Sequence, residues 1–262
     1  MATISTKTKD RLTAGVKKFQ PVLLSAKARD VNEADTVTIV TDMLADIFGF
    51  DKYSEITSEY VIRGTLVDLA IKLDGTLQTL IEVKAIGLDL KESHVKQAID
   101  YAVNQGVDWA ILTNGVIWRV YKVYFNKPIE QELVLEFDFL NVNHRDSDDI
   151  ARLYLLTKEG WSKASLGEYH AQKQVLSRYS IGAILLSDAV LEVVRRELRR
   201  ISPDVKIETE QVQEVLMQEV LKRDVVEGER ADDAKRKVSR VANRMLRKVS
   251  KEIAGDDSNK QQ

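Results

Sequence analysis

Residues 65–84, TLVDLAIKLDGTLQTLIEVK, contain two apolar runs separated by a turn signal. The tripeptide DGT at 74–76 predicts a tight turn, because glycine adopts positive φ at no steric cost and aspartate tolerates turn geometry. We therefore expect a β-hairpin with strands at 66–73 and 77–85. A three-residue loop would place Leu73 opposite Leu77, and this register then determines which side chains share a face.

The predicted register brings three charged side chains to one face of the hairpin. Counting back from the turn places Asp68 opposite Glu82, and Lys84 lies two residues beyond Glu82 on the same face. A two-residue loop would instead move Asp68 to the other face. That other face is expected to be apolar and to carry Val67, Leu69, Ile71, Ile81 and Val83.

Two carboxylates at this separation repel each other unless a cation lies between them. Mg²⁺ and Mn²⁺ prefer hard oxygen ligands and are often held by one or two carboxylates together with water. A lysine beside such a cation can orient an attacking water or stabilise a charged oxygen in a transition state. Asp68, Glu82 and Lys84 are therefore suited to phosphodiester hydrolysis. The alternative is an ordinary salt bridge on a solvated strand face.

The spacing of these residues resembles a known enzyme motif. Asp68, followed by Glu82, Val83 and Lys84 at the end of an apolar strand, is similar to the PD-(D/E)XK nuclease motif. Val67 stands where the family name has proline. The resemblance covers residues from about 31 to 139 and implies a restriction-endonuclease-like fold.

Gln97 and Tyr101 extend the resemblance into the next predicted helix. The segment QAIDY at 97–101 is similar to the QxxxY element of the RecB-like branch and of the N-terminal nuclease domain of type I restriction enzyme R subunits. In such a site Gln97 would hydrogen-bond a phosphate, a metal-bound water or a DNA base, and Tyr101 would hold that arrangement or contact a backbone phosphate. The alternative is a partly buried pair that fixes the helix against the sheet.

The resemblance implies a metal-dependent endonuclease that hydrolyses DNA. Asp68, Glu82 and the carbonyl of Val83 would bind Mg²⁺ or Mn²⁺, and Lys84 would position or activate the water. The alternative function is a non-catalytic nucleic-acid-binding or regulatory module on the same scaffold. DNA binding without cleavage would distinguish the second function from the first.

A third carboxylate is predicted on the helix before the hairpin. Residues 31–48 predict this helix, with Asn32 as its N-cap and with Glu33 at the positive end of the helix dipole. In PD-(D/E)XK nucleases such a helix supplies an acidic residue to the site, and Glu33 matches it by position. The alternative is a first-turn glutamate that is stabilised by the dipole alone.

The remaining pattern predicts an α/β fold with an αβββαβ core and a mixed central sheet. A short edge strand is expected at 58–63, a helix at 91–105, and strands at 108–113, 116–124 and 133–139. Asn114 and Gly115 predict a type I′ turn. Residues 1–30 are basic and predict a short helix or packed arm, broken at Pro21, that either contacts phosphates or serves as a solubilising terminus.

We expect a nuclease-like domain at 1–157 and a helical region at 158–262, with its main helices at 168–201, 208–224 and 231–253. The last helix is basic, and helical spacing suits it for phosphate contacts. The alternatives are a solvated face or an oligomer seam, and a homodimer through these helices would present two sites to the two DNA strands. The predicted phosphate-binding residues are Arg240, Arg244, Arg247, Lys248 and Lys251.

Composition restricts the cofactors, the compartment and the partners. The 262 residues carry a formal net charge of −2 and include no cysteine, which excludes thiolate metal sites. We expect a cytoplasmic protein with no membrane partner, because the N-terminus has no apolar signal region and the stretch at 181–194 is too short to span a bilayer. No G-x-x-x-x-G-K-[ST] loop occurs, so a motor or specificity subunit would be a separate partner.

Overall fold

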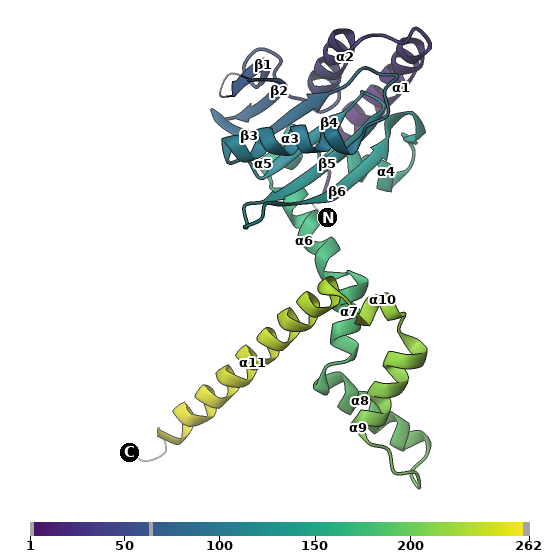
Figure 1. The fold of residues 1–262 in the computed structure, drawn as a ribbon, viewed down its shortest axis with the longest axis vertical. Helices are drawn as coiled ribbons and strands as arrows, with labels where there is room; N and C mark the ends of the chain where they lie inside the picture. Colours follow the sequence, from purple (N-terminus) through teal and green to yellow (C-terminus); the bar gives the residue numbers. More distant parts are fainter. Residues whose placement is uncertain (1–2, 63–64, 259–262) are drawn as a thin grey trace. The chain divides into compact units, whose positions relative to one another are not determined.

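The computed structural model of the chain describes residues 3–62 and 65–258, except for the side chains of residues 62, 65, 243 and 245–258. The chain divides into two compact units, Met1–Tyr169 and His170–Gln262 (Figure 1). The first unit contains the sheet and the candidate site. No helix among the described residues is long and apolar enough to cross a membrane.

A six-stranded mixed sheet lies at the centre of the first unit, so the predicted α/β class is confirmed. The strands follow one another across the sheet in chain order, and neighbours are antiparallel except β3 and β4, which are parallel. A parallel pair needs a crossover connection, and α3 (Glu92–Gln105) provides it. The strands are β1 (Ile56–Ile62), β2 (Thr65–Leu73), β3 (Thr76–Val83), β4 (Trp109–Thr113), β5 (Ile117–Tyr124) and β6 (Glu130–Asp138).

Helices cover both faces of the sheet (Figure 1). On one face, α1 (Thr6–Ala28), α2 (Glu33–Asp46) and α4 (Ser147–Tyr154) share the largest cluster of buried apolar residues with strand residues such as Trp118. On the other face, α3 packs against Leu112 and its neighbours. This division follows from the strands, because successive side chains point to opposite faces.

The predicted break of the first helix at Pro21 is wrong. Helix α1 runs through Pro21 without interruption, and its side chains Leu12, Val16 and Leu23 are completely buried. A proline inside a helix costs roughly 3 kcal/mol, and the apolar surface buried along α1 offsets that cost. The N-terminal segment is therefore part of the core and not a solubilising terminus.

The loop of the β2–β3 hairpin differs from the prediction. Its two residues, Asp74 and Gly75, have φ angles of 50° and 75°, and the pair after the loop is Leu73 with Thr76. Positive φ at both loop residues is the requirement of a type I′ turn, which matches the right-handed twist of the strands. The predicted three-residue loop, with Leu73 opposite Leu77, is therefore wrong.

A β-bulge restores the register further along the same hairpin. Lys72 pairs with Leu77 but Ile71 pairs with Thr79, so Gln78 is an extra residue in β3. Beyond this bulge the pairing is the one that a three-residue loop would have produced. Extending it by one position past the last pair, Leu69 with Ile81, brings Asp68 into line with Glu82.

A helix N-cap and a turn show how asparagine side chains replace backbone hydrogen-bond partners. Asn32 caps α2 as predicted, with its side chain accepting a hydrogen bond from the Asp35 N–H at 2.9 Å. The predicted type I′ turn at 114–115 is wrong, because only Gly115 has positive φ there. Instead, Oδ1 of Asn114 accepts hydrogen bonds from the N–H groups of the two residues after Gly115.

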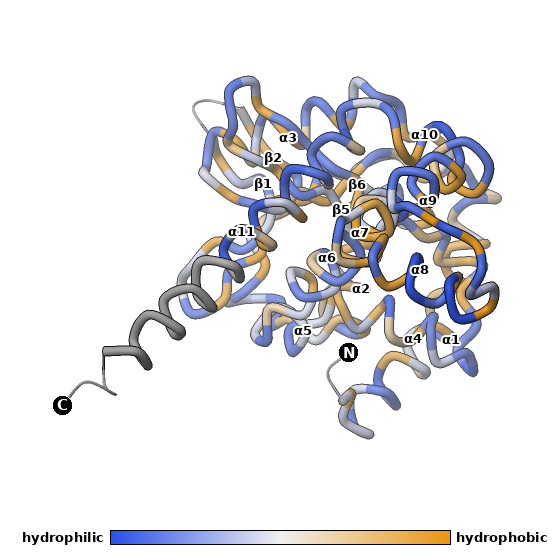
Figure 2. Tube along the Cα trace, turned by 90° about the horizontal axis from the view of Figure 1, so that it is seen from below, coloured by the Kyte–Doolittle hydropathy of each residue, from blue (hydrophilic) through white to orange (hydrophobic). Residues whose placement is uncertain are grey.

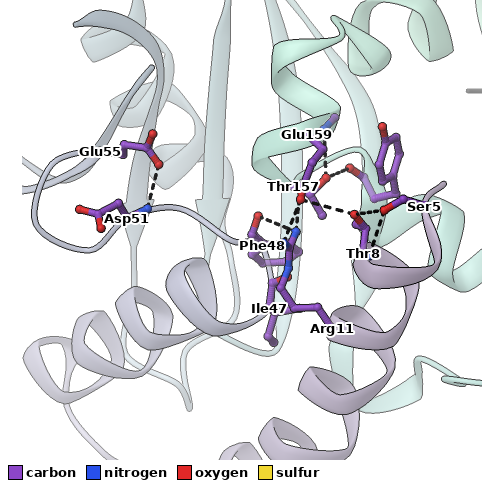
Figure 3. Close-up of polar contacts among 11 residues, drawn as sticks. Ser5, Thr8, Arg11, Ile47, Phe48, Asp51, Glu55, Thr157 and Glu159 are labelled. Atoms are coloured by element: carbon purple, nitrogen blue, oxygen red, sulfur yellow. Dashed lines mark hydrogen bonds and ion pairs between the residues drawn. The ribbon is translucent and has the colours of Figure 1, made fainter. Parts of the chain in front are cut away.

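The first unit extends past the predicted boundary at 157. Helix α5 (Lys158–Ser162) begins at the cap residue Thr157, and Trp161 and Leu166 are buried in the main core. Arg11 of α1 binds both carboxylate oxygens of Glu159, at 2.9 and 2.6 Å (Figure 3). The same guanidinium also donates to the carbonyl at the end of α2, so one side chain joins three helices.

The second unit is helical, and the predicted helix at 168–201 is divided in three. Breaks occur before Ser177 and Ser187, and Ser177 accepts a hydrogen bond from the Ser180 N–H as a side-chain N-cap. In Figure 2 the trace of α8 alternates between hydrophilic and hydrophobic residues. The remaining helices of the chain are η1 (Phe139–Asn141), α6 (Ser165–Val175), α7 (Arg178–Leu185), α8 (Asp188–Ile201), α9 (Thr209–Val215), the π-helical turn Leu216–Val220, α10 (Arg223–Val226) and α11 (Glu229–Ser258).

Two helical glycines provide a test of the packing between α1 and α2. A Cβ atom on Gly15 would lie 2.7 Å from Cγ1 of Ile47, whereas a Cβ atom on Gly167 would meet nothing within 4 Å. We expect Gly15→Ala to lower the free energy of unfolding by about 1–3 kcal/mol through overpacking. The matched control, Gly167→Ala, should raise it by up to ~1 kcal/mol because alanine favours the helix. Urea unfolding of both variants measures the difference, and equal stability would contradict the described contact.

Candidate active site

The charged residues of the hairpin lie where β3 ends beside β4. Glu82 is paired in register with Leu112 of β4, and the backbone N–H of Lys84 continues the pairing by donating to the Thr113 carbonyl at 2.8 Å. Glu82 is only 3% exposed and Lys84 only 9%. Both side chains are therefore desolvated, which is unusual for charged residues and requires compensating partners.

Lys84 is the cation around which the carboxylates are arranged. Its Nζ lies 2.6 Å from Oε1 of Glu82 and 3.6 Å from Oε2 of Glu33. Glu33 reaches this position from the first turn of α2 and remains 45% exposed at its side chain. The structure thus brings together three of the predicted site residues, from two elements about fifty positions apart in the chain.

Asp68 enters the site by replacing a backbone acceptor. The last pair of the β2–β3 ladder is Leu69 with Ile81, and beyond it the N–H of Val83 donates to Oδ2 of Asp68 at 2.7 Å. A carboxylate that accepts a backbone N–H is held in a fixed orientation. The charges of Lys84 and Glu33 act on Asp68, and the charge of Asp68 in turn acts on Glu82 and Lys84.

The second carboxylate oxygen of Glu82 has no hydrogen-bond partner among the described residues. This atom, Oε2, is fully buried, whereas Oε1 accepts the hydrogen bond from Lys84. A buried carboxylate oxygen without a partner is costly, and such atoms are rare in folded proteins. The site therefore contains one oxygen that can accept a further proton donor or cation.

Burial dominates the protonation behaviour of the site. It raises the pKa of Glu82 to about 7, although the hydrogen bond from Lys84 opposes this rise. Burial also raises the pKa of Asp68, against the Val83 hydrogen bond and the charge of Lys84. For Lys84, burial by itself lowers the pKa, but the hydrogen bond to Glu82 and the charges of the three carboxylates together raise it.

Gln97 and Tyr101 contact each other on α3. Nε2 of Gln97 donates to the Tyr101 hydroxyl at 3.1 Å, and Tyr101 packs against a small cluster that contains Val67 and Leu80. The prediction that Val67 shares the apolar face of Leu69 and Ile71 is therefore wrong, because it packs in a separate cluster beside Tyr101 of α3. The structure places the Gln97–Tyr101 pair next to the strand residue that precedes Asp68.

His94 is a site residue that the motif did not indicate. Burial, followed by the positive charges of Lys84 and Lys91, lowers the pKa of His94, so its ring lies within electrostatic range of the site. Its Nδ1 accepts a hydrogen bond from the Lys91 N–H at 3.3 Å, so in the neutral ring Nε2 carries the proton. The signal in the sequence was its helical spacing from Gln97, because both lie on one face of α3.

The loop that follows the lysine is anchored by two buried polar residues that the sequence pattern also missed. Oγ1 of Thr36 accepts a hydrogen bond from the Ile86 N–H at 3.1 Å, and Nδ2 of Asn114 donates to the Ile86 carbonyl at 3.4 Å. Thr36 lies one helical turn after Glu33. Its hydrogen bond therefore ties the helix that carries Glu33 to the strand end that carries the rest of the site.

The predicted phosphate-binding residues lie in the second unit, on α11. Arg240 and Arg244 are exposed there. The side chains of Arg247, Lys248 and Lys251 lie outside the described residues. For the two described arginines, exposure fits a surface that can contact an anion.

The carboxylates of the site include oxygens that suit a divalent metal. Within the described ranges 3–62 and 65–258, no three His, Cys, Asp or Glu side chains are arranged as a ready metal-binding group. The chemistry nevertheless fits a hard cation, because Glu82 has an unpartnered oxygen and Asp68 is held beside it by Val83. Asp68 and Glu82 are thus the residues that would hold a metal, and Glu33 is the nearest additional carboxylate to Lys84.

Comparison with known proteins adds no relative. No protein-family model matches the chain, and no curated protein or solved structure matches it. The geometry of the site is therefore the observation from which a function can be inferred.

We expect Glu82→Gln to gain stability relative to the parent as the pH rises. The Glu82 carboxyl has its ordinary pKa of 4.5 in the unfolded chain and a pKa of about 7 in the folded protein. The folded parent therefore binds more protons in this window and loses stability as the pH rises through it. At about 1.4 kcal/mol per pKa unit, the relative change is roughly 3 kcal/mol.

Urea unfolding of the parent and of Glu82→Gln at about pH 5 and about pH 8, without divalent cations, measures this change. Lys84 keeps its charge at both pH values, so it adds no slope of its own. A stability difference between the two proteins that stays constant with pH would contradict the assigned burial of Glu82.

Proposed function

We propose that this chain is a Mg²⁺- or Mn²⁺-dependent endonuclease that hydrolyses DNA phosphodiester bonds. One observation carries the proposal: Lys84 lies between the carboxylates of Glu82 and Glu33, with Asp68 held beside them on the Val83 N–H. Glu82 and Lys84 are buried, so their charges interact strongly with little screening by water. Perturbed carboxylates grouped with a buried lysine are typical of catalytic sites.

Each residue has a role that follows from its position. Asp68 and Glu82 would hold the divalent cation, which when bound polarises the phosphate and lowers the pKa of a coordinated water. Lys84 is a charged donor in a desolvated site, so it would stabilise negative charge on a phosphate oxygen or orient the water. Glu33, which remains half-exposed, would accept hydrogen bonds at the solvent side of the site.

The arrangement of elements supports a restriction-endonuclease-like core. The order α2, β1, β2, β3, α3, β4 corresponds to the αβββαβ pattern, with the mixed sheet that such a core requires. The acidic residue on α2 and the hairpin residues meet in space, as the resemblance implies. The Gln97–Tyr101 pair and His94 on α3 would then face the phosphate from the opposite side of the site.

DNA is the proposed partner, and the exposed arginines of α11 would add contacts to its phosphates. A homodimer through the second unit would bring two sites to one duplex, and a motor or specificity subunit would be supplied by another chain. A non-catalytic nucleic-acid-binding module is the second candidate function. The observation in its favour is that the Lys84 ammonium is already engaged by Glu82 at 2.6 Å.

We expect the parent to cleave supercoiled plasmid or single-stranded circles when Mg²⁺ or Mn²⁺ is present. Lys84→Ala and Asp68→Asn should each lower the cleavage rate by roughly 100-fold or more, because each removes a group that interacts with the transition state. Agarose-gel assays of nicked and linear products measure the rate.

Glu136→Gln is the matched control, because Glu136 is a surface carboxylate in a single ion pair with Arg119 and should leave the rate unchanged. If Lys84→Ala and Asp68→Asn cleave as well as the parent with Mn²⁺, the proposed site is wrong. DNA binding without cleavage, across metals and substrates, would favour the second candidate function.

A further inference from the structure

A single ammonium holds the position between two carboxylates in the candidate site. Nζ of Lys84 lies 2.6 Å from Oε1 of Glu82 and 3.6 Å from Oε2 of Glu33, and its side chain is 11% exposed. Such a short contact in a desolvated setting fixes the lysine in one conformation. The ammonium thus fills the position that a cation shared by these two acids would take.

The charges of the site are incompletely balanced. Three carboxylates, Glu33, Asp68 and Glu82, act on one another and on the single positive charge of Lys84. Oε2 of Glu82 lacks a partner among the described residues, so the ammonium compensates only one of the two oxygens of this buried acid. Removing the lysine would leave the buried carboxylate of Glu82 without its compensating charge, so this group would take up either a proton or a substitute cation.

We propose that Lys84 and the divalent cation compete for the carboxylate of Glu82, so that Lys84 sets an upper limit on metal affinity. The inference rests on the proposed function, because it concerns the metal site of that nuclease. Lys84 gives up Oε1 of Glu82 when a metal is held there, and its ammonium is then available to an anionic oxygen of the substrate. The lysine therefore has two successive partners, the carboxylate and the phosphate.

This competition predicts a result that a purely catalytic or purely structural lysine does not. A lysine that acts only on the substrate would leave metal affinity unchanged when it is replaced. A lysine that only organises the site would weaken metal binding on replacement. Competition instead predicts tighter metal binding in a variant that no longer cleaves DNA, because the repulsion between the ammonium and the metal is removed.

The experiment measures Mn²⁺ affinity by isothermal titration calorimetry on the full chain, without DNA. Lys84→Met keeps the aliphatic stem of the side chain and removes its charge. We expect its dissociation constant for Mn²⁺ to be at least ~10-fold lower than that of the parent. The matched control is Lys122→Met, because Lys122 also forms a 2.6 Å ion pair, with Asp108, and its loss changes the net charge equally. Its dissociation constant should stay within about twofold of the parent value.

A second measurement keeps the test decisive if Lys84→Met is unstable. Thermal unfolding of the parent and both variants is followed with and without Mn²⁺. Competition predicts that Mn²⁺ raises the melting temperature of Lys84→Met more than that of the parent, because ligand stabilisation grows with affinity. A Lys84→Met chain that stays unfolded in saturating Mn²⁺ would overturn the inference.

The outcomes separate the inference from the proposed function. If the parent binds Mn²⁺ and Lys84→Met binds it equally or more weakly, competition is overturned while the metal site stands. If neither protein binds Mn²⁺, the metal site and the inference both fail. If Lys122→Met tightens binding as much as Lys84→Met, the effect is one of net charge and the inference is again overturned.

Discussion

The registration of β2 against β3 is the constraint on which the candidate site depends. Side chains alternate between the two faces of a strand, so a slip of one residue would separate Asp68 from Glu82. The type I′ loop at Asp74 and Gly75 by itself would set a register that places Asp68 and Glu82 on opposite faces. The extra residue Gln78 shifts this register by one position, so that the two side chains share a face. The bulge also increases the local twist of the strands. Backbone pairing between β2 and β3 ends at Leu69, so the carboxylate of Asp68 accepts the hydrogen bond from the Val83 N–H in place of a backbone carbonyl.

Burial then determines how strongly the charged groups of the site interact. A carboxylate and an ammonium removed from water lose more hydration than their attraction usually returns, so a pair of this kind is poor evidence of stabilisation. The pKa of Glu82, raised to about 7 by burial, expresses that cost. Both proposals for Lys84 start from this property, because a buried pair that contributes little to stability is available for another role.

Much of the site was predictable because its signals are local. The turn tripeptide, the period-two alternation of the strands and the N-cap at Asn32 each depend on a few consecutive residues. The loop length was mispredicted because Gly75 suits two-residue and three-residue loops alike, and no local pattern marks the bulge at Gln78. The helix break predicted at Pro21 was wrong for a related reason, because burial of one face of α1 outweighs the local preference of proline against a helix interior. Thr36 and Asn114 were missed because an isolated polar residue gives no indication of its distant partner.

The sequence by itself determined the kind of chain this is: strands and helices in an α/β order, with Glu82 and Lys84 two residues apart at the end of one strand. Alternation of side chains is a property of each strand alone, whereas the alignment of Asp68 with Glu82 depends on the bulge at Gln78. Only the tertiary structure decided that Glu33 meets Lys84, that Asp68 accepts the Val83 N–H, and that Glu82 is buried with one oxygen unpartnered. Those facts depend on how α2 packs beside the end of β3 and on where β2 leaves its pairing with β3. A contact such as that of Glu33 with Lys84, about fifty positions away, produces no local sequence pattern that would predict it.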